Sequence, residues 1–200
     1  MADEAIRRKA PGEKVWYLPN VLTYGRILAV PIIAGLLMYG GDAAHWIALV
    51  VYIAAAVTDF FDGYLARLWH QQSALGRMLD PIADKVLVSV VLLVLAADGI
   101  LSGGHMWAAI VITAREVLVS GLREYLGELR VSVPVTKIAK WKTTLQLVAI
   151  GLLIAGPAGD DLIPHVSQAG LVMLWIAAAL TLYTGYDYFR AGLRHVVDGE

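Results

Sequence analysis

Six apolar stretches constrain this chain more than any other feature of its sequence. They fall at 21–41, 43–66, 79–98, 105–127, 141–157 and 168–188. A helix that crosses a membrane needs about 20 mostly apolar residues, so each stretch is close to one span. Only 16% of the residues are charged and 58% are hydrophobic, which leaves too few charges to cover a water-soluble protein of 200 residues. The sequence therefore predicts an all-α integral membrane protein, a bundle of six transmembrane helices.

Charge and cysteine content exclude several other classes of protein. The net charge of −1 does not fit a nucleic-acid-binding chain, and the apolar composition excludes an intrinsically disordered one. The chain has no cysteine, so it forms neither disulfides nor thiolate metal sites. A metal ion, if bound, must be held by oxygen or imidazole ligands.

Positive charges occur in alternate connections between the apolar stretches. Lysine or arginine precedes the first stretch and follows the second, fourth and sixth, whereas the connections at 40–42, 99–104 and 156–164 have neither. Basic connections remain on the cytoplasmic side of a membrane, which predicts that both termini are cytoplasmic. The first twenty residues lack the apolar core of a secretory signal. We expect a cytoplasmic or interfacial segment at 1–20, a six-helix transmembrane domain at 21–190 and a cytoplasmic tail at 191–200.

Four aspartates interrupt the apolar pattern where the second stretch ends and the third begins. Asp59 and Asp62 are three residues apart, and Asp80 and Asp84 are four apart. Both spacings place two side chains on one face of a helix, so the two pairs can converge near the inner membrane surface. Such a cluster binds protons unless cations neutralise it. Oxygen ligands favour Mg²⁺, Mn²⁺ or Ca²⁺, and two such ions about 4 Å apart can clamp an in-line displacement at phosphorus.

The residues between the acids favour a phosphate compound as the ligand. Gly63 and Ala66 each lie four residues after one of the first two aspartates, so the acidic face continues without bulk. The guanidinium of Arg67 can lie over a phosphate. In the alternative interpretation, the aspartates form salt bridges with Arg67, Arg77 and Lys85, and the small residues serve helix packing. Charges inside a membrane are costly and usually functional, and the four acids outnumber these three bases.

The acids and small residues together form the pattern Asp59-x2-Asp62-Gly63-x2-Ala66-Arg67-x8-Gly76-x3-Asp80-x3-Asp84. This pattern resembles the signature of the CDP-alcohol phosphotransferase family, with every fixed position present. The resemblance implies a six-helix membrane enzyme, usually a homodimer, that transfers a phosphatidyl group from CDP-diacylglycerol to an alcohol and releases CMP. It also implies that Asp59, Asp62 and Asp80 hold Mg²⁺ or Mn²⁺, expected as two ions, and that Asp84 is both a metal ligand and the general base.

Three further segments are similar to the bacterial phosphatidylglycerophosphate synthase branch of this family. They are 18–23 with Arg26, 114–116 leading to 122–124, and 137–144. The similarity implies sn-glycerol 3-phosphate as the acceptor and an active site on the cytoplasmic side of the inner membrane. By the same resemblance, the residues around the nucleotide are Asn20, Thr23, Arg26, Gly63, Ala66, Arg67 and Gly76.

An acceptor that carries a phosphate group requires a cationic subsite. Arg115 is the leading candidate, because a cation in the middle of an apolar stretch needs a wet cavity or a partner. Arg123, Lys137, Lys140 and Lys142 can complete the ring. An interhelical salt bridge explains Arg115 equally well. The lysines also fit a role in orienting the chain and in contacting anionic lipids.

Two other functions remain open on the sequence alone. A sibling transferase would use inositol phosphate, phosphatidylglycerol or serine as its acceptor. A cation transporter would need acids distributed across the depth of the membrane, whereas these acids crowd one side.

Overall fold

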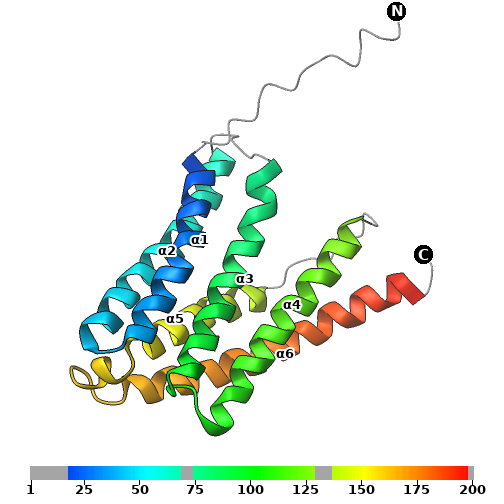
Figure 1. Cartoon of the computed structure of the whole chain (residues 1–200). Coiled ribbons are helices and arrows are strands. Elements are labelled where there is room, and N and C mark those ends of the chain that lie inside the picture. The colour runs from blue at the N-terminus through cyan, green and yellow to red at the C-terminus, as the bar shows by residue number, and fades with distance from the viewer. Residues whose placement is uncertain (1–17, 69–73, 129–136, 198–200) are drawn as a thin grey trace, which may run out of the picture.

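The computed structural model describes residues 18–68, 74–128 and 137–197, and this part of the chain is helical with short connections. Each predicted apolar stretch corresponds to one helix (Figure 1). The helices are α1 (Leu18–Tyr39), α2 (Asp42–Leu68), α3 (Ala74–Ala97), α4 (Met106–Glu128), α5 (Lys137–Asp160) and α6 (Val166–Val197), with a short 3₁₀ helix, η1 (Gly103–His105), before α4.

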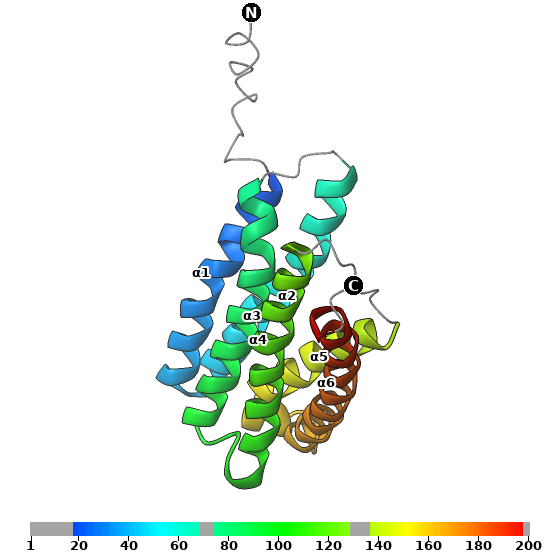
Figure 2. The same ribbon diagram turned by 90° about the vertical axis from the view of Figure 1, so that its right-hand side faces the viewer.

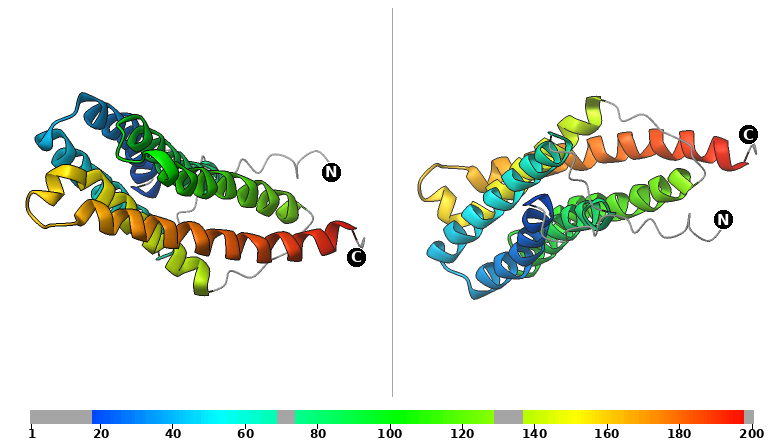
Figure 3. Two further views of the ribbon diagram at one scale, coloured as in Figure 1. Left: turned by 90° about the horizontal axis from the view of Figure 1, so that it is seen from below. Right: turned by 90° about the horizontal axis from the view of Figure 1, so that it is seen from above.

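The helices form a bundle in which neighbours in space are not always neighbours in the chain. The helix α1 packs on both α2 and α3, α6 packs on both α4 and α5, and α2 contacts α5 (Figure 2). Seen along the vertical direction of Figure 1, α2, α5 and α6 lie in one layer and α1, α3 and α4 lie in the other (Figure 3). This arrangement places α3 close to α1, α4 and α5 together.

Small residues allow the closest helix contacts in the bundle. A Cβ atom on Gly170 of α6 would lie 3.0 Å from Cγ of Leu153 on α5, so only glycine allows the two helices to approach this closely. Apolar side chains such as Ile33, Leu95 and Leu153 are fully buried between the helices. In a lipid environment, such packing is a main source of helix association.

By length and composition, five of the described helices are able to cross a membrane. They are α1, α2, α4, α5 and α6. The sixth, α3, carries Asp80, Asp84 and Lys85 in its first half, so its uncharged part is short. The prediction of an all-helical membrane bundle is confirmed, with five helices rather than six that are long and apolar enough to span a membrane among the described residues.

Candidate active site

Three of the four aspartates come together between α2 and α3. The charge of Asp59 on α2 interacts with the charges of Asp80 and Asp84 on α3. Asp62 lies on α2 one turn after Asp59, but its side chain is outside the described part of the structure. Gly63 and the side chains of Ala66 and Arg67 are likewise outside the described part. The predicted convergence of the two helices is therefore seen for Asp59, Asp80 and Asp84.

The helix α1 supplies partners for two of these aspartates. Nη1 of Arg26 lies 2.6 Å from Oδ1 of Asp59, and the Arg26 side chain is only 1% exposed. The hydroxyl of Thr23 donates a hydrogen bond of 2.5 Å to Oδ1 of Asp80. Asn20, one turn before Thr23, is also buried. The predicted nucleotide residues of α1 thus lie beside the carboxylates, and Thr23 and Arg26 bind them directly.

This donor set fits a hard divalent cation. Asp59 repels both Asp80 and Asp84, and its pairing with one arginine leaves negative charge that a cation would offset. Carboxylate oxygens are the ligands that Mg²⁺ and Mn²⁺ prefer. Among the described side chains, which do not include Asp62, no three acidic or histidine groups are arranged to hold a metal ion by themselves.

In the alternative interpretation, the aspartates form salt bridges with Arg67, Arg77 and Lys85. Of these three bases, only Lys85 has a described side chain. Nζ of Lys85 donates a hydrogen bond of 2.8 Å to the carbonyl of Pro81 in its own helix. The side chains of Arg67 and Arg77 lie outside the described residues. The base that does pair with Asp59 is Arg26, from a different helix.

Two polar cavities lie next to each other beside Asp84. The smaller, of about 20 Å³, is lined by Asp84, Gln146 and Thr143 among others. The larger, of about 150 Å³, extends between α3 and α4. Lys85 and Glu116 line both cavities, so the two adjoin at these side chains.

Arg115 lines the larger cavity and is also fixed to α6. Its Nε donates to the carbonyl of Thr181 at 2.9 Å, and its Nη2 donates to the hydroxyl of Thr184 at 3.0 Å. Gly185 leaves room for it, because a Cβ atom there would lie 3.1 Å from Cγ of Arg115. The nearest acid is Glu116 of the same helix, with Nη1 of Arg115 3.5 Å from its Oε1. Arg115 is therefore bound to α6, as the interhelical interpretation expects, but by two uncharged groups rather than by an acid.

The other predicted acceptor residues differ in their surroundings. Arg123 lines the larger cavity, and its Nη2 donates to the hydroxyl of Tyr188 at 3.2 Å. Lys142 is only 4% exposed, and its amine is bound to the carboxylate of Glu116. Lys137 and Lys140 lie at the start of α5, and their side chains are outside the described residues.

Glu116 and Gln146 contribute more to the site than sequence reasoning assigned to them. Glu116 accepts from Lys142 across 26 positions of sequence and lines both polar cavities. Gln146 is a polar residue in an apolar run, four residues after Lys142 and so on the same helix face. That interruption is a signal from which Gln146 is recognisable in the sequence.

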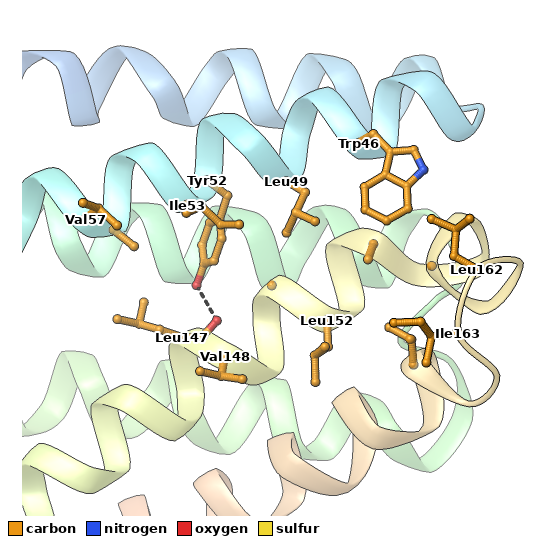
Figure 4. A pocket seen from close by; sticks show the side chains of 15 residues that line it. Trp46, Leu49, Tyr52, Ile53, Val57, Leu147, Val148, Leu152, Leu162 and Ile163 are labelled. Atoms are coloured by element: carbon orange, nitrogen blue, oxygen red, sulfur yellow. Dashed lines mark hydrogen bonds between the residues drawn. The ribbon is translucent and has the colours of Figure 1, made fainter.

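An apolar cavity of about 440 Å³ lies between α2 and α5 (Figure 4). Leu49, Ile53 and Leu152 are among its lining residues. The hydroxyl of Tyr52 donates to the carbonyl of Leu147 at 3.1 Å and links the two helices. Leu147 also lines the small polar cavity, so this residue separates an apolar space from a polar one.

Comparison with known proteins gives concordant matches over most of the chain. Residues 16–183 match the family model described as CDP-alcohol phosphatidyltransferase. The chain is 42% identical to a protein of Cereibacter sphaeroides named "CDP-diacylglycerol--glycerol-3-phosphate 3-phosphatidyltransferase", covering 92% of this chain and 98% of that protein. Proteins of the same name are 44% identical in Rickettsia bellii, covering 87% and 94%, and 35% identical in Escherichia coli strain K12, covering 90% and 97%.

Proposed function

The chain belongs to the CDP-alcohol phosphatidyltransferase family, and on that premise we propose that it transfers the phosphatidyl group of CDP-diacylglycerol to sn-glycerol 3-phosphate. The products are phosphatidylglycerophosphate, a phospholipid precursor, and CMP. The observation that carries this proposal is that Asp84 lines a small polar cavity, which adjoins a larger cavity lined by Arg115 and Arg123. The larger cavity has three basic residues, with Lys85, against the two acids Glu116 and Glu124. A phosphorylated acceptor fits such a cavity better than serine does.

The donor's diphosphate belongs at the aspartates. Asp59, Asp62, Asp80 and Asp84 would hold Mg²⁺ or Mn²⁺, which we propose as two ions, and these ions would supply charge neutralisation at phosphorus. Arg26 and Thr23 keep Asp59 and Asp80 oriented. The nucleotide contacts that we propose are Asn20, Thr23, Arg26, Gly63, Ala66, Arg67 and Gly76.

The diacylglycerol part of the donor remains in the membrane. The apolar cavity between α2 and α5 supports this placement, because it offers only apolar contacts beside the polar site. The hydroxyl of Tyr52, which would otherwise be unpaired there, is already bound to the carbonyl of Leu147. An acyl chain in this cavity would therefore meet no unsatisfied group.

The acceptor lies with its phosphate toward Arg115 and Arg123 and its free hydroxyls toward Asp84. Asp84 takes the proton from the 1-hydroxyl, whose oxygen attacks the β-phosphorus while the bond from that phosphorus to CMP breaks. Positioned general-base catalysis contributes typically about 10²–10⁴-fold. The rest of the rate enhancement comes from alignment and charge stabilisation. Lys137 and Lys140 extend the cationic ring in this proposal, whereas Lys142 is bound to Glu116 and acts through it.

The proposed topology follows the charge pattern of the connections. We propose that α3 completes a set of six spans, that both termini are cytoplasmic, and that the site opens to the cytoplasm from the inner membrane. The domain then covers 21–190 between a terminal segment at 1–20 and a tail at 191–200. A homodimer is part of the same proposal.

A direct assay tests the reaction and the acceptor together. Purified protein is incubated with CDP-diacylglycerol, Mg²⁺ and one of four acceptors: glycerol 3-phosphate, inositol phosphate, serine or phosphatidylglycerol. We expect CMP and phosphatidylglycerophosphate with glycerol 3-phosphate, and no CMP when excess chelator is present. A different lipid product would show that another alcohol is the acceptor. The absence of CMP with every alcohol would contradict the transferase function and favour a transporter.

Replacing Arg115 by glutamine is expected to raise the KM for glycerol 3-phosphate about tenfold or more, because a charge-assisted contact to the phosphate is lost. The KM for CDP-diacylglycerol is expected to stay within about twofold of its original value. Steady-state kinetics with each substrate varied in turn measures both constants.

The control for this variant is Thr184→Val, which removes the hydroxyl that Arg115 contacts on α6 but keeps the cation. Its acceptor KM is expected to remain near that of the unmodified protein. If both variants raise the acceptor KM equally, or if neither does, Arg115 is a structural residue.

A further inference from the structure

The small cavity beside Asp84 contains a buried polar atom without a partner. Gln146 is 3% exposed, and among the described residues its Oε1 atom has no hydrogen-bond partner. The side chain lines the same cavity as Asp84. Because a buried acceptor without a hydrogen bond is costly, most such atoms in native proteins are paired. Gln146 therefore requires a donor that the described residues do not provide.

Two other acceptors around this cavity already have partners. The carbonyl of Leu147 accepts from Tyr52, as the dashed line in Figure 4 shows. The carboxylate of Glu116 binds Lys142 and lies 3.5 Å from Arg115. Oε1 of Gln146 therefore faces the cavity as an acceptor in addition to the carboxylate of Asp84.

The size of the cavity limits what the donor can be. A volume of about 20 Å³ admits a group of the size of one water molecule or one hydroxyl. The larger cavity, which contains Arg115 and Arg123, adjoins it at Lys85 and Glu116. A compound with its phosphate in the larger cavity can therefore place one hydroxyl in the smaller one.

We infer that Oε1 of Gln146 accepts a hydrogen bond from the 2-hydroxyl of the acceptor, and that this contact selects a glycerol phosphate over a phosphorylated alcohol without that hydroxyl. The inference rests on the proposed function, which places the acceptor phosphate at Arg115 and its 1-hydroxyl at Asp84. The 2-hydroxyl belongs to the carbon between these ends, on the side where α5 contributes Gln146. A site built to bind a hydroxyl discriminates strongly against an analogue that lacks it.

The test compares two acceptors, sn-glycerol 3-phosphate and 3-hydroxypropyl phosphate, which lacks only the 2-hydroxyl. The ratio of their kcat/KM values is measured for the unmodified protein and for Gln146→Met, which keeps the length of the side chain but not its hydrogen-bonding groups. We expect the unmodified protein to prefer glycerol 3-phosphate by about tenfold or more. In Gln146→Met this preference is expected to fall to within about threefold of unity, through loss of activity with glycerol 3-phosphate alone.

Two further variants separate recognition from packing. Gln146→Glu keeps an acceptor oxygen in place and is expected to keep the preference even if its kcat changes. Leu145→Met is a volume-conserving change on the same helix, outside both polar cavities, and is expected to leave the preference unaltered.

Three results would overturn the inference. The first is equal use of both acceptors by the unmodified protein, a measurement that needs no variant to fold. The second is an unchanged ratio in Gln146→Met, and the third is a lost ratio in Leu145→Met. Failure of the proposed function looks different, because the unmodified protein would then form no phosphatidylglycerophosphate from glycerol 3-phosphate.

Discussion

Replacing Asp84 by asparagine is expected to lower kcat by about 10²–10⁴-fold, the usual contribution of a positioned general base. Asparagine has nearly the same shape as aspartate but cannot take the proton from the acceptor hydroxyl. The proposed nucleotide contacts do not include Asp84, and Asp59, Asp62 and Asp80 would still hold the metal ions, so binding of CDP-diacylglycerol is expected to persist. Turnover is followed by CMP release, and donor binding is followed by calorimetry with CDP-diacylglycerol in detergent.

Asp98→Asn is a matched control for the loss of Asp84. Asp98 immediately follows α3, and its carboxylate lies 3.7 Å from Nε2 of His45, far along the helix from Asp80 and Asp84. Asp98→Asn is expected to keep kcat within about twofold of that of the unmodified protein. If Asp84→Asn turned over at the rate of Asp98→Asn, Asp84 would have no catalytic role.

The sequence predicts the helices well because their length and hydropathy are local properties. Each apolar stretch corresponds to a helix, and α3 already stands out in the sequence, since its uncharged part begins only at Val86. The convergence of Asp59 with Asp80 and Asp84 is also accessible, because the three- and four-residue spacings fix which side chains share a face.

The rest of the site depends on how the helices are rotated against one another, which spacing within one helix does not determine. The pairing of Arg26 with Asp59 and of Lys142 with Glu116 joins residues from different helices. The sequence identified Arg26 and Lys142 as ligand-binding candidates, whereas the structure shows each of them bound to an acid of the protein. The sequence shows Gln146 as a polar residue in an apolar run, but only the structure shows that its Oε1 atom is buried without a hydrogen-bond partner among the described residues.

Replacing Lys142 by methionine is expected to lower the free energy of unfolding by about 3 kcal/mol, because it leaves the carboxylate of Glu116 without its closest cation in a buried place. The Glu116 side chain is only 16% exposed. We expect a value near the lower end of the usual range, because Nη1 of Arg115 remains 3.5 Å from the same carboxylate. For a chain of 200 residues, this corresponds to a fall of roughly 6–12 °C in Tm.

The double variant Glu116→Gln with Lys142→Met separates an unpaired charge from a general loss of packing. Removal of both charges leaves no uncompensated carboxylate, and neutral replacement of a buried ion pair is often tolerated. We therefore expect the double variant to recover at least half of the lost Tm, measured by thermal unfolding in one detergent for all variants. Arg190→Gln, an exposed change on α6, provides the baseline and is expected to shift Tm by less than about 2 °C. If the double variant has a Tm as low as that of Lys142→Met, the destabilisation comes from the lost packing of the lysine side chain and not from an unpaired carboxylate at Glu116.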